Sequence, residues 1–231
     1  MTVIEPPADP MGYAAAVLDC PVFERLALTD EDRRRGGMYA EQRQRAELRR
    51  GAGTVEDFLR SLEMRMAMGP APSASLPRVA QLTQKTNQLN LTTRRHTEQE
   101  VRALAADPCA RVYDVAVRDR FGDSGLVGVA IARLDGDAWE IDTLLLSCRV
   151  IGRAVETAML ARLAEDARAA GATRLRGWFL PTRKNAPARD IYPAHGFVMT
   201  DESDGATRWE LDLRDGGPRW PEWIASSNEQ R

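Results

Sequence analysis

The sequence predicts an α/β (α+β) protein with a mixed central sheet flanked by helices and a helical extension at its N-terminus. Three strand-like runs follow one another in the middle of the chain with short turns between them, as in an antiparallel meander. A long helix-like run then separates two further strand-like runs, which is typical of a crossover between parallel strands. We expect a helical extension over residues 1–60, an α/β domain over 61–214 and a polar tail over 215–231.

The first sixty residues have the pattern of helices. Thr29, followed by Asp30-Glu31-Asp32, is a plausible helix start, and an arginine-rich helix is expected from about Asp32 to Arg50. Its interleaved glutamates favour a solvated face over a site for an acidic partner. Thr54 then begins a short helix through Leu62 with a spacing similar to a capping box.

The remaining elements follow from alternation and helical periodicity. Helices are expected over 76–89, from Thr97 to about 107, over 151–170 and over 187–195. Strands are expected over 62–68, 111–118, 126–134, 139–146, 173–180, 198–200 and 209–213. The resulting order is β-α-α-β-β-β-α-β-α-β-β, which implies a mixed sheet.

Composition narrows the class of protein. A chain of 231 residues with 43% hydrophobic residues can bury a sizeable core, and its net charge of −2 gives no general attraction to nucleic acid. Three cysteines without a C-x-x-C pair, together with two histidines, argue against a metal site or a disulfide framework. No apolar run approaches the roughly 18 residues of a membrane span, and the N-terminus does not have the pattern of a secretory signal. We therefore expect a cytoplasmic protein without a metal, nucleic-acid or membrane partner.

The turn over residues 147–154 carries the strongest functional signal. It follows a strand and precedes a helix, so its backbone N–H groups have no helical partners and lie at the positive end of the helix dipole. Gly152 and Ala154 are small enough for an anion to approach the backbone. Arg149 and Arg153 could add charge-assisted hydrogen bonds. We expect this turn, with Val150 and Ile151, to bind phosphate.

Two motifs resemble those of the GNAT acyltransferases. Arg149-x-x-Gly152-x-Ala154 is similar to the pyrophosphate signature Q/R-x-x-G-x-G/A, and the second cofactor motif of the family is matched at Asn185, Ala188, Tyr192 and Gly196-Phe197. The resemblance implies a GNAT-like sheet and a cofactor that is acetyl-CoA or another acyl-CoA, or alternatively an acyl-phosphopantetheine. It also implies that the strand before the turn splays open and lends an N–H near Leu144 or Leu145 to the thioester oxygen. The implied cofactor-binding residues are Leu144, Leu145, Leu146, Arg149, Val150, Ile151, Gly152, Arg153, Ala154, Asn185, Ala188 and Tyr192.

A narrower resemblance covers about residues 9–213. Residues 78–95, 119–128, 141–156 and 181–185 are similar to the C-terminal half of FkbH-like proteins, which join a HAD-like domain to a GNAT-like domain. That family name implies loading of a glyceryl unit from a glycolytic phosphate onto an acyl-carrier protein thiol. We find no D-x-D-type nucleophile motif after an N-terminal strand, so this chain is not expected to perform the loading alone.

Tyr192, Glu140 and Asp142 are the candidate catalytic residues. Tyr192 stands where the resemblance places a thiolate-protonating tyrosine, and a phenol with a pKa near 10 suits that task; packing in the core is the alternative. Glu140 and Asp142 lie two apart on a strand and so share a face, where either could draw a proton from an amine. A cap or salt bridge is the alternative role for both.

The acceptor site is expected in the loop between the first two helices of the α/β domain. Asn87, Asn90, Thr92 and Arg94 are the candidate substrate-binding residues, and a loop that satisfies its own polar groups is the alternative. The predicted function is acyl-CoA-dependent acyl transfer, most simply N-acetylation of a small amine in a specialised-metabolite pathway such as antibiotic biosynthesis. Transfer to or from an acyl-carrier protein thiol and a non-catalytic carrier-binding module remain alternatives. A homodimer is among the expected assemblies.

Overall fold

The computed structural model describes residues 9–13 and 30–227. The chain divides into two compact units, Met1–Glu47 and Leu48–Arg231. The first unit contains the short 3-10 helix η1 (Pro10–Gly12) and most of helix α2 (Asp30–Gly51). The helix start predicted at Thr29 lies outside the described residues.

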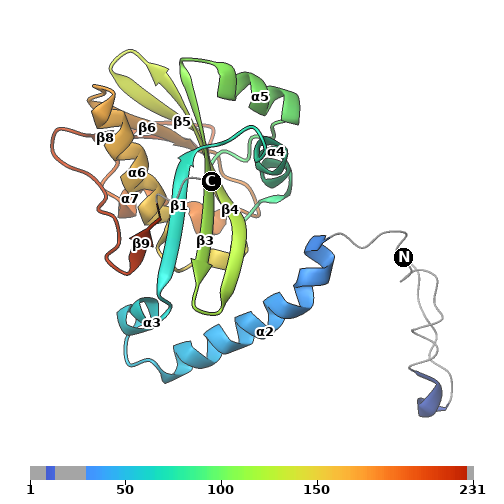
Figure 1. Ribbon diagram of the computed structural model, residues 1–231. Helices are drawn as coiled ribbons and strands as arrows, with labels where there is room; N and C mark the ends of the chain where they lie inside the picture. The colour runs from blue at the N-terminus through green and yellow to red at the C-terminus, as the bar shows by residue number, and fades with distance from the viewer. Residues whose placement is uncertain (1–8, 14–29, 228–231) are drawn as a thin grey trace. The chain divides into compact units, whose positions relative to one another are not determined.

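The second unit is built on one mixed sheet (Figure 1). Among the described residues its order is β7-β8-β6-β5-β4-β3-β1-β9, with β2 beside β5. The pairs β5–β6 and β1–β9 are parallel, and the other pairs are antiparallel. The strands are β1 (Met64–Pro70), β2 (Leu89–Asn90), β3 (Ala110–Asp119), β4 (Gly122–Asp135), β5 (Ala138–Leu146), β6 (Arg174–Phe179), β7 (Val198–Ser203), β8 (Ala206–Asp212) and β9 (Ile224–Ser226).

Helices cover both faces of this sheet and bury two separate cores. The helices are α3 (Val55–Ser61), α4 (Leu76–Lys85), α5 (Glu98–Ala106), α6 (Val155–Ala169) and α7 (Ile191–Ala194), with the 3-10 helices η3 (Cys148–Val150) and η4 (Ala186–Ala188). The larger core packs α3, α6 and α7 against one face, and the smaller core packs α4 and α5 against the other. Strand β5 contributes to both, because Leu144 and Leu146 belong to the larger core and Leu145 to the smaller.

The predicted α/β architecture is confirmed, including the meander β3–β4–β5 and the crossover helix α6 between parallel strands. Some local predictions were wrong. The helix expected over 187–195 is divided into the 3-10 helix η4 and the four-residue helix α7. The helix expected over 76–89 ends at Lys85, because Thr86 has extended backbone angles and the chain then enters β2. The tail contains strand β9, whose Ile224 is buried and pairs with Met64 of β1.

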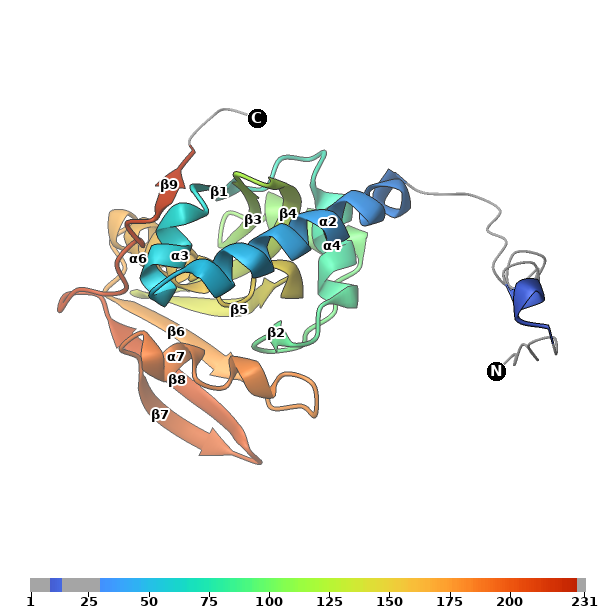
Figure 2. The same ribbon diagram turned by 90° about the horizontal axis from the view of Figure 1, so that it is seen from below.

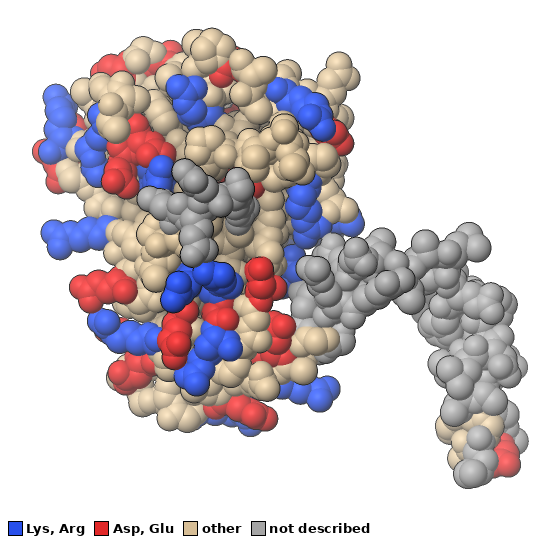
Figure 3. All heavy atoms as spheres, viewed as in Figure 1, with Lys and Arg blue, Asp and Glu red and all other residues tan. Residues whose placement is uncertain are grey.

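Two observations bear on membranes and polyanions. No helix in the described part of the chain is long and apolar enough to cross a membrane. On the face drawn in Figure 3, basic and acidic side chains are interspersed, in keeping with the balanced charge of the sequence.

The N-terminus of α5 provides a stability prediction. Thr97 Oγ1 accepts a hydrogen bond from Glu100 N (3.2 Å), and a Glu100 carboxylate oxygen accepts one from Thr97 N (2.7 Å). Thr97→Ala should lower the free energy of unfolding by about 1 kcal/mol, because it removes the acceptor of the otherwise unpaired Glu100 amide. Urea unfolding measures this change. Thr97→Ser retains the hydroxyl and should behave like the wild type; equal losses in both variants would contradict the capping role.

Candidate functional site

The site begins where β5 and β6 separate. Their parallel pairing runs from Ala138↔Arg174 to Ile141↔Gly177 and then stops, while β5 continues along β4 to Leu146. Asp142 is the extra residue of a β-bulge, since Ile141 and Thr143 pair with consecutive residues of β4. A bulge bends its strand, so β5 leaves β6 at this point, as the GNAT resemblance implies.

The gap between the separated strands is filled by residues 89–91 of the chain itself, here called the bridging segment. Leu89 and Asn90 pair with Leu146 and Leu145, and Leu91 N donates to Leu144 O (3.1 Å). On its other side the segment reaches the end of β6, because Leu180 N donates to Leu91 O (2.8 Å). Figure 2 shows β2 at the ends of β5 and β6.

This pairing corrects the expectation that the edge of β5 at Leu144, Leu145 and Leu146 is open to a cofactor. All three side chains are fully buried, and the Leu144 carbonyl is engaged by the bridging segment. A two-residue strand is too short to show alternation, so no pattern of residues predicted this pairing.

The loop between β5 and α6, residues 147–154, is here called the anion loop. Gly152 and Ala154 have positive φ angles, +77° and +60°, and Ala154 is the N-cap of α6 without a side-chain cap. The first-turn amides of this 15-residue helix therefore receive no hydrogen bond from an N-cap side chain. Gly152 is exposed, and a Cβ added there would meet nothing within 4 Å. Val150 is fully buried and anchors the loop, whereas Ile151 is exposed.

The two arginines of the anion loop differ in direction. Arg153 is buried and forms an ion pair with the fully buried Asp119 (Nη1 to Oδ2, 3.0 Å), and its Nη2 donates to Arg149 O (2.8 Å). Arg153 therefore fastens the loop to β3 and does not face a ligand, contrary to the sequence prediction. Arg149 is partly exposed, and its Nε donates to Ser147 Oγ (3.3 Å).

Asn185 and Ala188, two residues of the second motif, are both fully buried. Asn185 Oδ1 accepts from Thr182 N (2.7 Å), and Asn185 Nδ2 donates to Asn90 O (2.9 Å) and Leu180 O (3.0 Å). The Asn185 amide thus ties the loop after β6 to the bridging segment.

The Tyr192 hydroxyl lies at the point where β5 and β6 part. The side chain is fully buried in α7, and its ring packs on Phe197 with centroids 4.8 Å apart. Its oxygen occupies the space of a missing side chain, since a Cβ on Gly177 would lie 2.0 Å from it. The hydroxyl has no hydrogen-bond partner among the residues that the structure describes. Burial and the charge of Glu140 raise the pKa of Tyr192 above its usual value, so the oxygen keeps its proton.

The two candidate carboxylates have different surroundings. Asp142 is buried and bound by Arg94, with His96 Nε2 3.2 Å from its Oδ2 and Thr143 Oγ1 donating to the same oxygen (3.0 Å). Burial acts to raise the pKa of Asp142, but the hydrogen bond from His96 and the charge of Arg94 outweigh it, and the pKa is held well below its usual value. Such a carboxylate is a weak proton acceptor.

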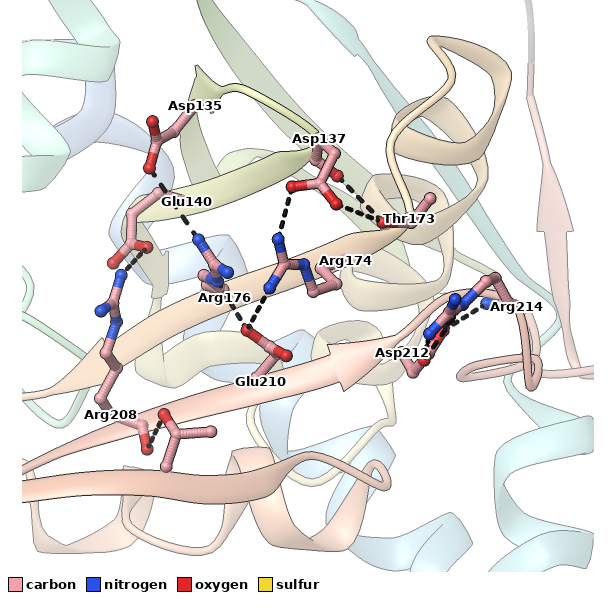
Figure 4. A network of polar contacts seen from close by, with 11 residues as sticks. Asp135, Asp137, Glu140, Thr173, Arg174, Arg176, Arg208, Glu210, Asp212 and Arg214 are labelled. Carbon is pink, nitrogen blue, oxygen red and sulfur yellow. Dashed lines mark hydrogen bonds and ion pairs between the residues drawn. The ribbon is translucent and has the colours of Figure 1, made fainter.

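Glu140 belongs to a group of charged side chains on β5, β6 and β8. It accepts from Arg208 Nη2 (3.1 Å), and Figure 4 shows this pair beside the pair formed by Arg176 and Glu210 (2.6 Å). The side chain of Glu140 is partly exposed, so solvent or a substrate can reach its carboxylate.

The loop between α4 and α5 satisfies its own polar groups. The four candidate substrate-binding residues all have partners within the chain, which matches the alternative that the sequence left open. Asn87 Oδ1 accepts from Arg95 Nη2 (2.5 Å), Asn90 Oδ1 accepts from Thr93 N (2.8 Å), Thr92 Oγ1 donates to Asp142 O (2.9 Å), and Arg94 binds the Asp142 carboxylate.

Sequence reasoning missed two residues of the site. Gly177 lacks the side chain that would displace the Tyr192 hydroxyl, and the only available signal was a glycine inside a strand. Glu156, in the first turn of α6, has a buried carboxylate oxygen with no partner in the described structure, and burial raises its pKa. No group of three or more metal-ligating side chains occurs in the described ranges.

Comparisons with known proteins support the fold. No protein-family model matches the sequence, and no curated protein matches it. Among solved structures, the ribosomal-protein-S18-alanine N-acetyltransferase from Escherichia coli is similar with a TM-score of 0.50 and 14% identity, covering 64% of this chain and 94% of that chain. A domain from Methanocaldococcus jannaschii gives a TM-score of 0.51 at 13% identity, with 64% and 99% of the two chains covered.

A third similar structure is a chimeric spermidine N-acetyltransferase from Vibrio cholerae and hSSAT, with a TM-score of 0.50, 12% identity and coverage of 65% and 97%. At these identities the likeness establishes a shared fold. The chain has the fold of the GNAT N-acetyltransferases.

Asp142 provides a pH prediction. Because its pKa is lowered in the folded state, the stability it contributes is complete above the ordinary carboxyl pKa of about 4 and is lost as the pH falls below that value. Asp142→Asn should therefore weaken the loss of unfolding free energy between pH 7 and pH 3, measured by urea unfolding at each pH. Asp201→Asn, at an exposed position on β7, is the control and should leave the wild-type loss unchanged. Equal losses in all three proteins would refute the assignment.

Proposed function

We propose that this protein is an acyltransferase that takes an acyl group from an acyl-CoA thioester and transfers it to an amine. The observation that carries the proposal is the buried, unpartnered Tyr192 hydroxyl at the separation of β5 and β6. Burying a hydroxyl without a hydrogen bond costs roughly 1–3 kcal/mol. A role as proton donor to a leaving thiolate accounts for the presence of this unfavourable group. The N-acetyltransferase names of two similar structures support the same reaction class.

The residues present fit such a cofactor at its phosphate end. The exposed Gly152 leaves the anion loop open, and the uncapped first turn of α6 presents N–H groups and the positive end of a helix dipole to phosphate oxygens. Arg149 is partly exposed beside these groups. When bound, an acyl-CoA supplies an activated thioester carbonyl and a thiolate leaving group.

The chain's own groups would manage the protons. Tyr192 holds its proton at Oη, because its raised pKa keeps the phenol neutral, and donation to a thiolate would occur from that atom. Of the two carboxylates, Glu140 is the better candidate to draw a proton from an amine, directly or through water. Both carboxylates have an arginine partner, Arg208 for Glu140 and Arg94 for Asp142, but Glu140 is partly exposed whereas Asp142 is buried. Asp142 would position the loop between α4 and α5.

The finer parts of the proposal concern the substrates. We propose acetyl transfer to a small amine of a specialised-metabolite pathway. Transfer to or from an acyl-carrier protein thiol, which the likeness to FkbH-like proteins implies, is the second candidate. It is favoured by exposed Arg183, Lys184 and Arg189 on the segment between β6 and α7, which would attract an acidic carrier. Assays with acetyl-CoA and panels of amines and carrier proteins distinguish the two acceptors.

The anion loop can be tested with Gly152→Glu. A carboxylate at this open position should repel the cofactor phosphates and weaken coenzyme A binding at least 100-fold, measured by isothermal titration calorimetry. Gly152→Gln is the matched control, because it imposes the same strain at a positive φ without the charge. Equal affinities in the Glu and Gln variants would exclude phosphate binding at this loop.

Tyr192→Phe separates a catalytic hydroxyl from a packing role. We expect turnover to fall about 10- to 100-fold, while the free energy of unfolding stays unchanged or rises by up to about 1 kcal/mol, because the lost hydroxyl has no partner. Tyr113→Phe is the control: its hydroxyl donates to Asp166 Oδ2 (2.9 Å), so that variant should lose stability and keep its turnover. Full activity in Tyr192→Phe would remove the tyrosine from the mechanism.

A further inference from the structure

The bridging segment lies on the route that a pantetheine arm would take. The anion loop follows Leu146 directly, and the Tyr192 hydroxyl lies at the other end of the same gap, against Gly177. A linear arm held by its phosphates at the loop and reaching that hydroxyl must run back along the edge of β5 from Leu146 toward Ile141. Residues 89–91 occupy this edge.

The segment also takes the backbone groups that the arm would use. A pantetheine arm carries two amide groups, which pair with a strand edge as a peptide does. In the structure Leu91 N already donates to Leu144 O, and Leu89 is in register with Leu146. The side chains of Leu89 and Leu91 fill the gap and belong to the larger core, together with Leu144, Leu146 and Tyr192. The arm and the segment therefore cannot occupy the gap together.

The segment is held in this place by contacts that can be named one by one. Leu89 and Asn90 pair with Leu146 and Leu145, and further hydrogen bonds are made at Leu144 O, at Leu180 N and by the Asn185 side chain. Asn90 makes its side-chain hydrogen bonds within the same loop, to Thr86 O (3.3 Å) and from Thr93 N. Such a loop can leave the gap as a unit, with its internal hydrogen bonds intact.

We propose that residues 89–91 act as an internal strap that closes the thioester-binding gap, and that coenzyme A binds only when this strap leaves β5. The proposal rests on the proposed function and adds a regulatory step to it. Since only the open form binds, the apparent affinity equals the intrinsic affinity multiplied by the open fraction. A change that loosens the strap should therefore tighten coenzyme A binding.

Leu91→Ala tests this relation. It removes apolar contacts that exist only while the strap is closed, and we expect coenzyme A to bind at least 10-fold more tightly than to the wild type in calorimetry. Leu82→Ala is the matched control, because Leu82 is also a buried leucine but lies on α4 in the smaller core. The control should bind like the wild type.

Hydrogen–deuterium exchange gives a second measurement. It uses the wild-type protein and therefore does not require Leu91→Ala to fold. The amides of Leu91 and Leu180 should exchange slowly without ligand and faster when coenzyme A saturates the protein, opposite to the usual protection on binding. Unchanged protection of Leu91 with coenzyme A bound, or equal affinities in the wild type and Leu91→Ala, would overturn the strap and leave the proposed function standing. If neither the wild type nor either variant binds coenzyme A, the proposed function is wrong and the proposed strap is wrong with it.

Discussion

The end of the β5–β6 pairing at Ile141 and Gly177 is the constraint on which the site depends. Up to this pair the two strands share a parallel ladder, and beyond it the bulge at Asp142 directs β5 along β4 alone. The separation leaves backbone groups of β5 without a strand partner in β6. Buried backbone groups must be paired, so something has to enter the gap. In this structure the chain enters it itself, through residues 89–91.

Several groups are arranged around this one geometric event. The anion loop follows the end of β5, so its position is set by where β5 goes, and the buried Arg153–Asp119 ion pair holds it against β3. Breaking a buried pair by removing one partner leaves an uncompensated charge, which makes the pair a firm anchor for a loop whose outer surface is open. At the other end of the gap, the missing side chain of Gly177 makes room for the Tyr192 hydroxyl. The anion loop therefore lies at one end of the gap and the Tyr192 hydroxyl at the other.

The polar contacts of the loop between α4 and α5 favour a structural role for its side chains over a substrate-binding role. Arg94, His96 and Thr92 all meet at Asp142, the bulged residue, and so link this loop to the bend in β5. An ionised carboxylate with these partners holds the loop close to the gap. The same loop carries the bridging segment, so the bulge that opens the gap also holds the piece of chain that closes it. Glu140, which Figure 4 shows paired with Arg208, is outside this arrangement, and its side chain is partly exposed.

The sequence by itself determined the architecture and the two motif regions. Alternation, helical periodicity and turn residues are local properties, and they were sufficient for the meander, for the crossover helix α6 and for the loop with Gly152 at its centre. Only the tertiary structure decided what the individual side chains do. Arg149 and Arg153 look equivalent in the motif, but Asp119, distant in the chain, draws Arg153 inward. The two-residue strand β2 and the three-residue strand β9 exist only because partners distant in sequence, β5 and β1, offer an unpaired edge. Pairing of that kind depends on which edges remain open after the sheet has formed, and no local pattern of residues records it.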